Sequence, residues 1–156
     1  MNISSAAKKA LIPVEREIMF QPVEHLYQLN NQGKVIIHLK GNTDSVNIKY
    51  MQDNLISTHN HPEKSYYNNF LSTSDIICAI KLRNREVRAI TQDGYCHLAE
   101  IPEMDFFEKF NCQCTLIRYK DLFKKEGYSW SLIRKMKKEI EKAYGIKFRT
   151  ILLPKN

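Results

Sequence analysis

Short apolar runs alternate with turn residues through much of the chain, a pattern typical of β-strands. The predicted strands share β-branched and aromatic residues, and they cover residues 23–29, 34–40, 46–50, 55–61, 86–91, 95–101 and 148–153. Asn30-Asn31-Gln32-Gly33 and Gln92-Asp93-Gly94 are hairpin turns, because asparagine, aspartate and glycine accept the backbone angles that tight turns require.

Helical spacing of apolar residues indicates helices over residues 72–84, 104–110, 114–125 and 129–144. The last of these has an apolar stripe and ends at Gly145, a typical helix-terminating residue; the stripe comprises Leu132, Ile133, Met136, Ile140 and Tyr144. At the start of the chain, residues 1–12 are interpreted as a polar tail or short capping helix, and residues 14–21 show no clear period. The pattern predicts one α/β domain of the α+β type, with strands first and helices toward the end.

Length and composition agree with an ordinary globular domain. The 156 residues suffice for a hydrophobic core, and no apolar run approaches the roughly 18 residues that span a bilayer. The N-terminus lacks the apolar centre of a secretory signal, and we interpret the four cysteines as free thiols. We therefore expect a cytoplasmic protein with no membrane partner; the sequence predicts no particular oligomeric state.

The formal net charge of +7 is concentrated toward the C-terminus, where lysine and arginine cluster between residues 120 and 147. Basic residues occupy one side of the helix predicted at 129–144. This side is either a solvated face or a docking surface for an acidic partner or nucleic acid.

Two histidines separated by one residue are the most informative chemical feature. His59 and His61 follow an apolar strand segment, and Pro62 ends it. Side chains at i and i+2 of an extended segment point to the same face, so both imidazoles can converge on one metal ion. The alternative is two surface histidines in a polar loop.

Asp75 is the candidate third ligand. Ser72-Thr73-Ser74-Asp75 begins an apolar-periodic helix, so Ser72 and Asp75 also fit a helix capping box, a purely structural role. Capping does not exclude ligation, and two histidines with one carboxylate leave a catalytic zinc one open position.

Hydrolysis further requires a general base that is not a ligand. Glu15, Glu17 and Glu24 are the upstream candidates. We favour Glu24, because it begins a strand expected in the same sheet as His59 and His61.

These residues resemble the JAMM motif of the JAB/MPN-type zinc metallopeptidases, which pairs a His-x-His-Pro element with Ser-x-x-Asp and an upstream glutamate. The segment from Glu24 to Gly41 resembles the run before this motif in RadC-like bacterial members, and residues 86–98 resemble the following hairpin in JAB-like segments of phage and mobile-element proteins. The resemblance covers residues 14–101, the motif-bearing core of a single domain 1–156; residues 102–156 are expected to be a helical, basic C-terminal extension.

The resemblance implies a cytidine-deaminase-like sandwich of a mixed sheet and flanking helices, with Zn²⁺ as cofactor. It assigns His59, His61 and Asp75 as zinc ligands, Ser72 as support for the oxyanion or bound water, and Glu24 as the general base. It also implies hydrolysis of peptide or isopeptide bonds in a protein substrate, such as a ubiquitin-like modifier of a bacterial, phage or antiviral-defence system. The ten residues 62–71 form a longer spacer than is usual in this family, which predicts a reshaped substrate cleft.

Two other functions fit the same residues. The first is a non-catalytic JAB-like binding or assembly module of a phage or mobile element, which would use the basic C-terminal face. The second is a metal-independent nuclease or toxin with His59 and His61 as acid and base.

Overall fold

The computed structural model describes residues 3–43, 45–46, 55–62 and 70–154. Helices and strands follow one another as α1 (Ser5–Ile18), β1 (His25–Leu29), β2 (Val35–Lys40), β3 (Ile56–His61), α2 (Thr73–Lys81), β4 (Glu86–Thr91), β5 (Tyr95–Glu100), α3 (Phe106–Glu126), α4 (Trp130–Tyr144) and β6 (Lys147–Leu152). Within the described part of the chain, none of the helices combines the length and apolar character that crossing a bilayer requires.

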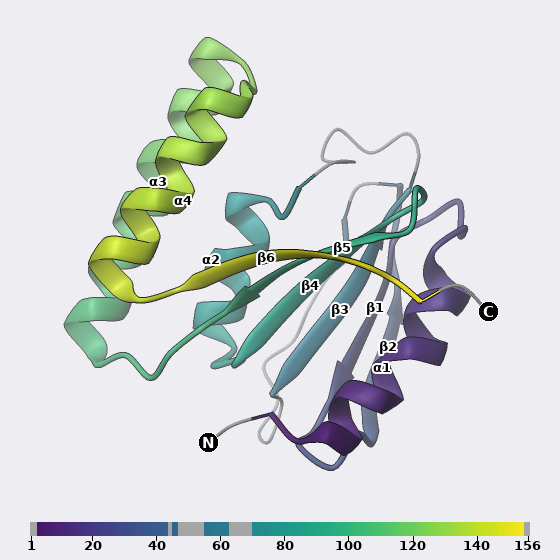
Figure 1. The fold of residues 1–156 in the computed structure, drawn as a ribbon. Helices are drawn as coiled ribbons and strands as arrows, with labels where there is room; N and C mark the ends of the chain where they lie inside the picture. Colours follow the sequence, from purple (N-terminus) through teal and green to yellow (C-terminus); the bar gives the residue numbers. More distant parts are fainter. Residues whose placement is uncertain (1–2, 44, 47–54, 63–69, 155–156) are drawn as a thin grey trace.

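The six strands form one mixed sheet in the order β2-β1-β3-β4-β5-β6 (Figure 1). All neighbouring strands are antiparallel except β3 and β4, which are parallel and are connected through α2. A parallel pair needs such a crossover, because the chain must return to the starting edge before the second strand begins. The expected α+β class with a mixed sheet is confirmed.

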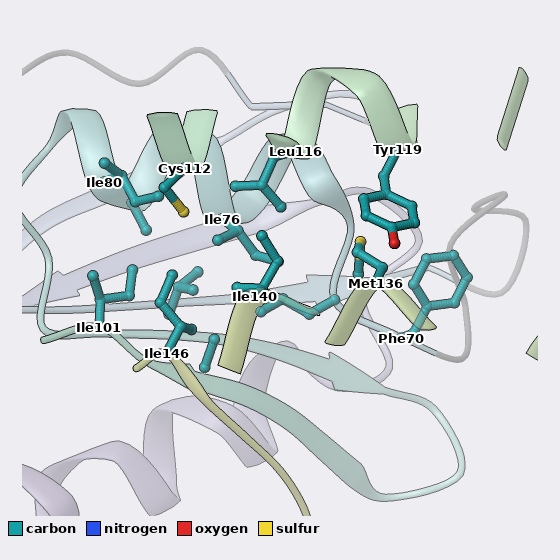
Figure 2. Packing of buried hydrophobic residues seen from close by; sticks show 14 of the residues in the cluster. Phe70, Ile76, Ile80, Ile101, Cys112, Leu116, Tyr119, Met136, Ile140 and Ile146 are labelled. Atoms are coloured by element: carbon teal, nitrogen blue, oxygen red, sulfur yellow. The ribbon is translucent and has the colours of Figure 1, made fainter. Parts of the chain in front are cut away.

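Helices cover both faces of the sheet. On one face, α1 packs its buried residues against β1 and β3, around Leu11, Leu29 and Ile56. On the other face, α2 packs over β4 and α4 contacts β6, and α3 packs on α2 and α4. Figure 2 shows this larger core, where Ile76 of α2, Leu116 of α3 and Ile140 of α4 meet. The sheet is therefore enclosed as the central layer.

The helix expected as one alternative near the N-terminus is present, but it is longer than predicted: a single helix of 14 residues covers Ser5–Ile18 and includes part of the segment in which we found no period. Ser4 caps it, accepting a hydrogen bond from the amide of Ala7. Pro13 concealed the helix in the sequence, since proline removes one backbone hydrogen bond. Pro13 lies on the exposed side, where water can solvate the carbonyl that loses its partner, so the buried stripe continues past it.

Two other expectations need correction. The two helices predicted at 104–110 and 114–125 are one helix, α3, and Trp130 is exposed at the start of α4 instead of packing against the sheet. The strand predicted at residues 46–50 lies almost entirely outside the described residues. The C-terminal strand is confirmed as β6, which pairs with β5 and completes the sheet edge.

A buried ion cluster joins α1 to the sheet on the face opposite α2. Arg88 of β4 makes a bidentate pair with Glu15 of α1 and also contacts Glu86, with a distance of 2.7 Å between Arg88 Nη1 and Glu86 Oε1. Thr58 donates a further hydrogen bond to Glu15. Burial raises the pKa of Glu15, and the Arg88 guanidinium opposes that rise. Arg88 therefore bridges two buried carboxylates, one from α1 and one from its own strand.

We predict that Arg88→Met lowers the free energy of unfolding by about 3–5 kcal/mol, because it leaves two buried carboxylates without their cation. Arg149→Met is the matched control, since Arg149 pairs with Glu100 at the surface, where such pairs contribute about 0–1 kcal/mol. Urea unfolding followed by circular dichroism measures both. Equal, small losses in the two variants would contradict a structural role for the buried cluster.

Candidate metal centre

The alternation of β3 brings the two histidines together. All six residues of β3 are buried, and the side chains of Ser57, His59 and His61 face α2, whereas Thr58 lies on the opposite face against Glu15 of α1. The Nε2 atoms of His59 and His61 lie 3.0 Å apart. The expectation that both imidazoles point to one place is therefore confirmed.

Asp75 completes the group from the first turn of α2. Its Oδ1 lies 3.5 Å from His59 Nε2, and its Oδ2 lies 3.8 Å from His61 Nε2. Ligands about 2.0–2.1 Å from one ion at tetrahedral angles are separated by about 3.3–3.4 Å. The separations of 3.0 Å between the two Nε2 atoms and 3.5 Å between His59 Nε2 and Oδ1 lie close to that value. One ligand atom from each of the three residues lies within 4.8 Å of the others, so His59, His61 and Asp75 can hold a metal ion.

The carboxylate of Asp75 takes part in the capping box of α2 and is also the candidate metal ligand. Ser72 Oγ accepts a hydrogen bond from the Asp75 amide, and the Asp75 carboxylate accepts one from the Ser72 amide through Oδ2, at 2.8 Å. Oδ1 is the oxygen nearest His59. The capping interaction therefore fixes the carboxylate beside the imidazoles instead of competing with ligation.

The electrostatics of the three residues are strongly coupled. Burial favours neutral His59, but the carboxylates of Asp75 and, less strongly, Glu24 outweigh it and raise the pKa of His59. Burial likewise opposes ionisation of Asp75, yet His59, His61 and the hydrogen bond from Ser72 lower the pKa of that carboxyl group well below its usual range. Without a cation, a proton on His59 therefore supplies the positive charge that this carboxylate needs.

Glu24 is buried and lies immediately before β1, on the same face of the sheet as the histidines. Leu26, two residues later, is directly opposite His59 in the β1–β3 pairing, so the strand alternation places Glu24 beside the end of β3. Its effect on the pKa of His59 is consistent with this position. The structure thus places Glu24 at the edge of the candidate site.

The other two candidates for the general base, Glu15 and Glu17, lie on the face of the sheet opposite the histidines. Glu15 accepts its hydrogen bonds from Thr58 and Arg88, on the α1 side of the sheet. Glu17 accepts a hydrogen bond from the hydroxyl group of Tyr27, which packs in the core under α1. The sheet separates both from His59, which leaves Glu24 as the upstream acid beside the site.

The sequence analysis missed the role of Asn60, between the two histidines. Its side chain points away from them, accepts a hydrogen bond from the His25 amide at 2.6 Å, and donates to the carbonyl oxygens of Gln21 and Val23. These contacts lie on both sides of Glu24 in the chain. Asn60 therefore fixes the backbone that carries Glu24, a role that becomes visible only when β1 and β3 are paired.

A second polar group lies on the same face of the sheet as the histidines, around Ser57, two residues before His59 in β3. Ser57 accepts a hydrogen bond of 2.7 Å from the Asn84 side chain, and fully buried Gln28 is opposite Ser57 in the β1–β3 pairing. Neither amide atom of Gln28, nor the side-chain oxygen of Asn84, hydrogen-bonds to a described residue. The polar character of this sheet face thus extends beyond the histidines, a feature that the sequence analysis did not predict.

The C-terminal third contacts segments next to the site. Lys120 of α3 donates a hydrogen bond of 3.0 Å to Ser74, in the first turn of α2. Phe70 is buried against Tyr128, with ring centroids 5.2 Å apart. Tyr66 and Tyr67 lie outside the described residues.

Comparisons with protein-family models, curated proteins and solved structures gave no match to this chain.

We predict that metal affinity falls as the pH drops from about 8 to 6, because the raised pKa of His59 lets protons compete with the metal from a higher pH than at an ordinary histidine. The lowered pKa of Asp75 keeps its carboxylate charged throughout this range. Calorimetric titration with zinc in buffers of different ionisation enthalpy should detect about one proton released per bound ion at the lower pH. An affinity independent of pH would contradict this account.

We also predict that Asp75→Asn lowers the metal content of the purified protein at least tenfold, because it removes the charged ligand while keeping an oxygen that can cap the helix. Glu108→Gln is a matched control, since Glu108 has the same position in the capping box of α3. Elemental analysis without added metal measures both variants. Retention of metal in Asp75→Asn would place the ion elsewhere.

Proposed function

We propose that this protein is a zinc-dependent hydrolase of peptide or isopeptide bonds, as its resemblance to JAB/JAMM metallopeptidases implies. The observation that carries the proposal is the convergence of His59, His61 and Asp75 within 4.8 Å of one another, with Glu24 on the same face of the sheet.

The donor set favours zinc over the other common cations. Magnesium and calcium prefer all-oxygen ligation, whereas imidazole nitrogens with one carboxylate suit zinc. When held by His59, His61 and Asp75, a zinc ion would leave room for water or substrate and would supply Lewis-acid activation of a water molecule and of a carbonyl group.

Two residues of the chain supply the remaining chemistry. Glu24, which is buried on the same face of the sheet as the histidines, would accept the proton of the attacking water and return it to the leaving amine. Ser72, at the N-terminus of α2, would support the oxyanion together with the positive end of that helix. Asn60 would act as a positioning residue for Glu24 through its three backbone hydrogen bonds.

The metal-independent nuclease fits this geometry less well. A general acid and a general base must stand on either side of the reacting group. The Nε2 atoms of His59 and His61 instead face each other at 3.0 Å, which leaves no space for a phosphodiester between them. Their arrangement suits a shared ion.

The proposed substrate is a protein, and a ubiquitin-like modifier joined through an isopeptide bond is the form suggested by the JAMM resemblance. A bacterial conjugation or phage system would supply such a substrate. A non-catalytic assembly module is the alternative, and a protein that binds zinc stoichiometrically but cleaves no amide would support it.

We predict that Glu24→Gln lowers amide hydrolysis by about 10²–10⁴-fold while zinc content stays near one ion per chain, because the variant loses the proton acceptor but no ligand. Glu17→Gln is the matched control on the opposite face of the sheet and should retain activity. The assay uses isopeptide-linked ubiquitin-like conjugates and fluorogenic peptides, with elemental analysis in parallel. Unchanged hydrolysis in Glu24→Gln would refute its role as the base.

A further inference from the structure

The outward side of α4 carries positive charge that the helix itself does not balance. The buried side of α4 comprises Ile133, Met136 and Ile140. The basic face of α4 lies on the exposed side and comprises Arg134, Lys135, Lys138 and Lys142. Three of these cations follow one another at four-residue intervals, so they are neighbours on the helix surface, where like charges destabilise a helix. The first turn of α4 also lacks an acidic residue, which the positive end of the helix would favour.

The two glutamates of α4 do not pair with this basic face, because other groups engage them. Glu139 accepts hydrogen bonds from the guanidinium group of Arg118 and, at 2.6 Å, from the hydroxyl group of Tyr119, both on α3. Glu141 accepts a hydrogen bond of 3.3 Å from the backbone amide of Phe148 in β6. Within the part of the chain that the structure describes, none of the four cations of the basic face forms an ion pair. The positive charge therefore lacks a counterion there.

An exposed aromatic ring lies at the N-terminal end of this face. Trp130 is the first residue of α4 and is 58% exposed. It precedes Arg134 by four residues, and its carbonyl oxygen accepts a hydrogen bond of 3.3 Å from Arg134 Nε. Figure 1 shows α3 and α4 projecting together beyond the sheet, so the start of α4 lies away from it. A line of cations with an aromatic ring is the combination that binds single-stranded nucleic acids.

The composition of this surface favours a nucleic acid over an acidic protein. Protein interfaces have an apolar centre from which lysine is depleted, whereas the basic face of α4 offers one ring among arginine and lysine. Protein–nucleic acid interfaces are polar and strongly positive. Cations four residues apart in a helix are separated by about 6 Å along its axis, a step that the phosphates of an extended strand can follow. An exposed ring favours a single strand, because a duplex keeps the faces of its bases stacked.

We propose that the basic face of α4 binds single-stranded nucleic acid, with its four cations on phosphates and Trp130 stacked on a base. Contacts to phosphates and to the face of a base carry little sequence information, so binding is tolerant of sequence and strongly dependent on salt. This binding is separate from the metal centre, to which α4 contributes no ligand.

Fluorescence titration tests the proposal directly, because Trp130 is the only tryptophan of the chain. An oligonucleotide of deoxythymidine or of uridine should quench its emission, and the comparison of the two distinguishes DNA from RNA. Displacement of counterions from about four phosphates predicts a slope of about −3 when the logarithm of the binding constant is plotted against that of the salt concentration.

Three variants test the contacts. Lys138→Gln should weaken binding several-fold at low salt and make the salt slope shallower by about 0.7, because one phosphate contact is lost. Lys9→Gln is the matched control, since it makes the same charge change at an exposed lysine of α1 and should alter neither value. Trp130→Ala should weaken binding roughly fivefold to a hundredfold, measured by the anisotropy of a labelled oligonucleotide. Circular dichroism and zinc content should be unchanged in all three, which keeps this test independent of the metal centre.

Several results would overturn the proposal. One is the absence of quenching at low salt, and another is undiminished binding by Trp130→Ala. Equal losses in Lys9→Gln and Lys138→Gln would mean that net charge alone attracts the strand. A polyglutamate peptide that binds more tightly than either oligonucleotide would assign this face to an acidic protein, and tighter binding of a DNA duplex would exclude the single-stranded ligand.

Discussion

The alternation of β3 is the constraint on which the site depends. This strand is buried on both faces, so each polar side chain must find its partner on a fixed side. His59 and His61 meet Asp75 on the α2 face, whereas Thr58 and Asn60 serve the opposite face, where they contact Glu15 and the backbone before β1. A shift of one residue in register would exchange these faces and separate the imidazoles from the carboxylate.

The parallel pairing of β3 with β4 explains why Asp75 is available at all. The chain must cross over between these strands, and α2 provides the crossover. Its N-terminus therefore lies beyond the end of β3 that carries His61, at the carboxyl edge where α/β proteins commonly bind ligands. The candidate site arises from topology as much as from the three side chains.

The sequence predicted most of the strands and the candidate ligands, because a two-residue spacing and a capping box are local signals. The sequence-based prediction failed where a feature depends on contacts between residues that are far apart in the sequence. The length of α1 was missed because of Pro13, since only the folded structure shows that this proline faces solvent. Helix α3 was predicted as two helices because apolar residues on its two opposite sides obscure the helical period. Glu24 was already favoured over Glu15 from its position in a predicted strand, whereas the role of Asn60 follows from strand pairing, which sequence spacing does not reveal.

The charged groups of the candidate centre make its contribution to stability depend on pH. Burial opposes both the charge on Asp75 and the protonation of His59, yet the capping box fixes the carboxylate beside the imidazoles. Without a cation, the charge pair stabilises the fold most between the lowered pKa of Asp75 and the raised pKa of His59. Stability is lost above that window as His59 deprotonates, and below it as Asp75 becomes protonated. At neutral to alkaline pH a bound cation would replace the lost proton, so metal binding and folding should reinforce each other most above that window.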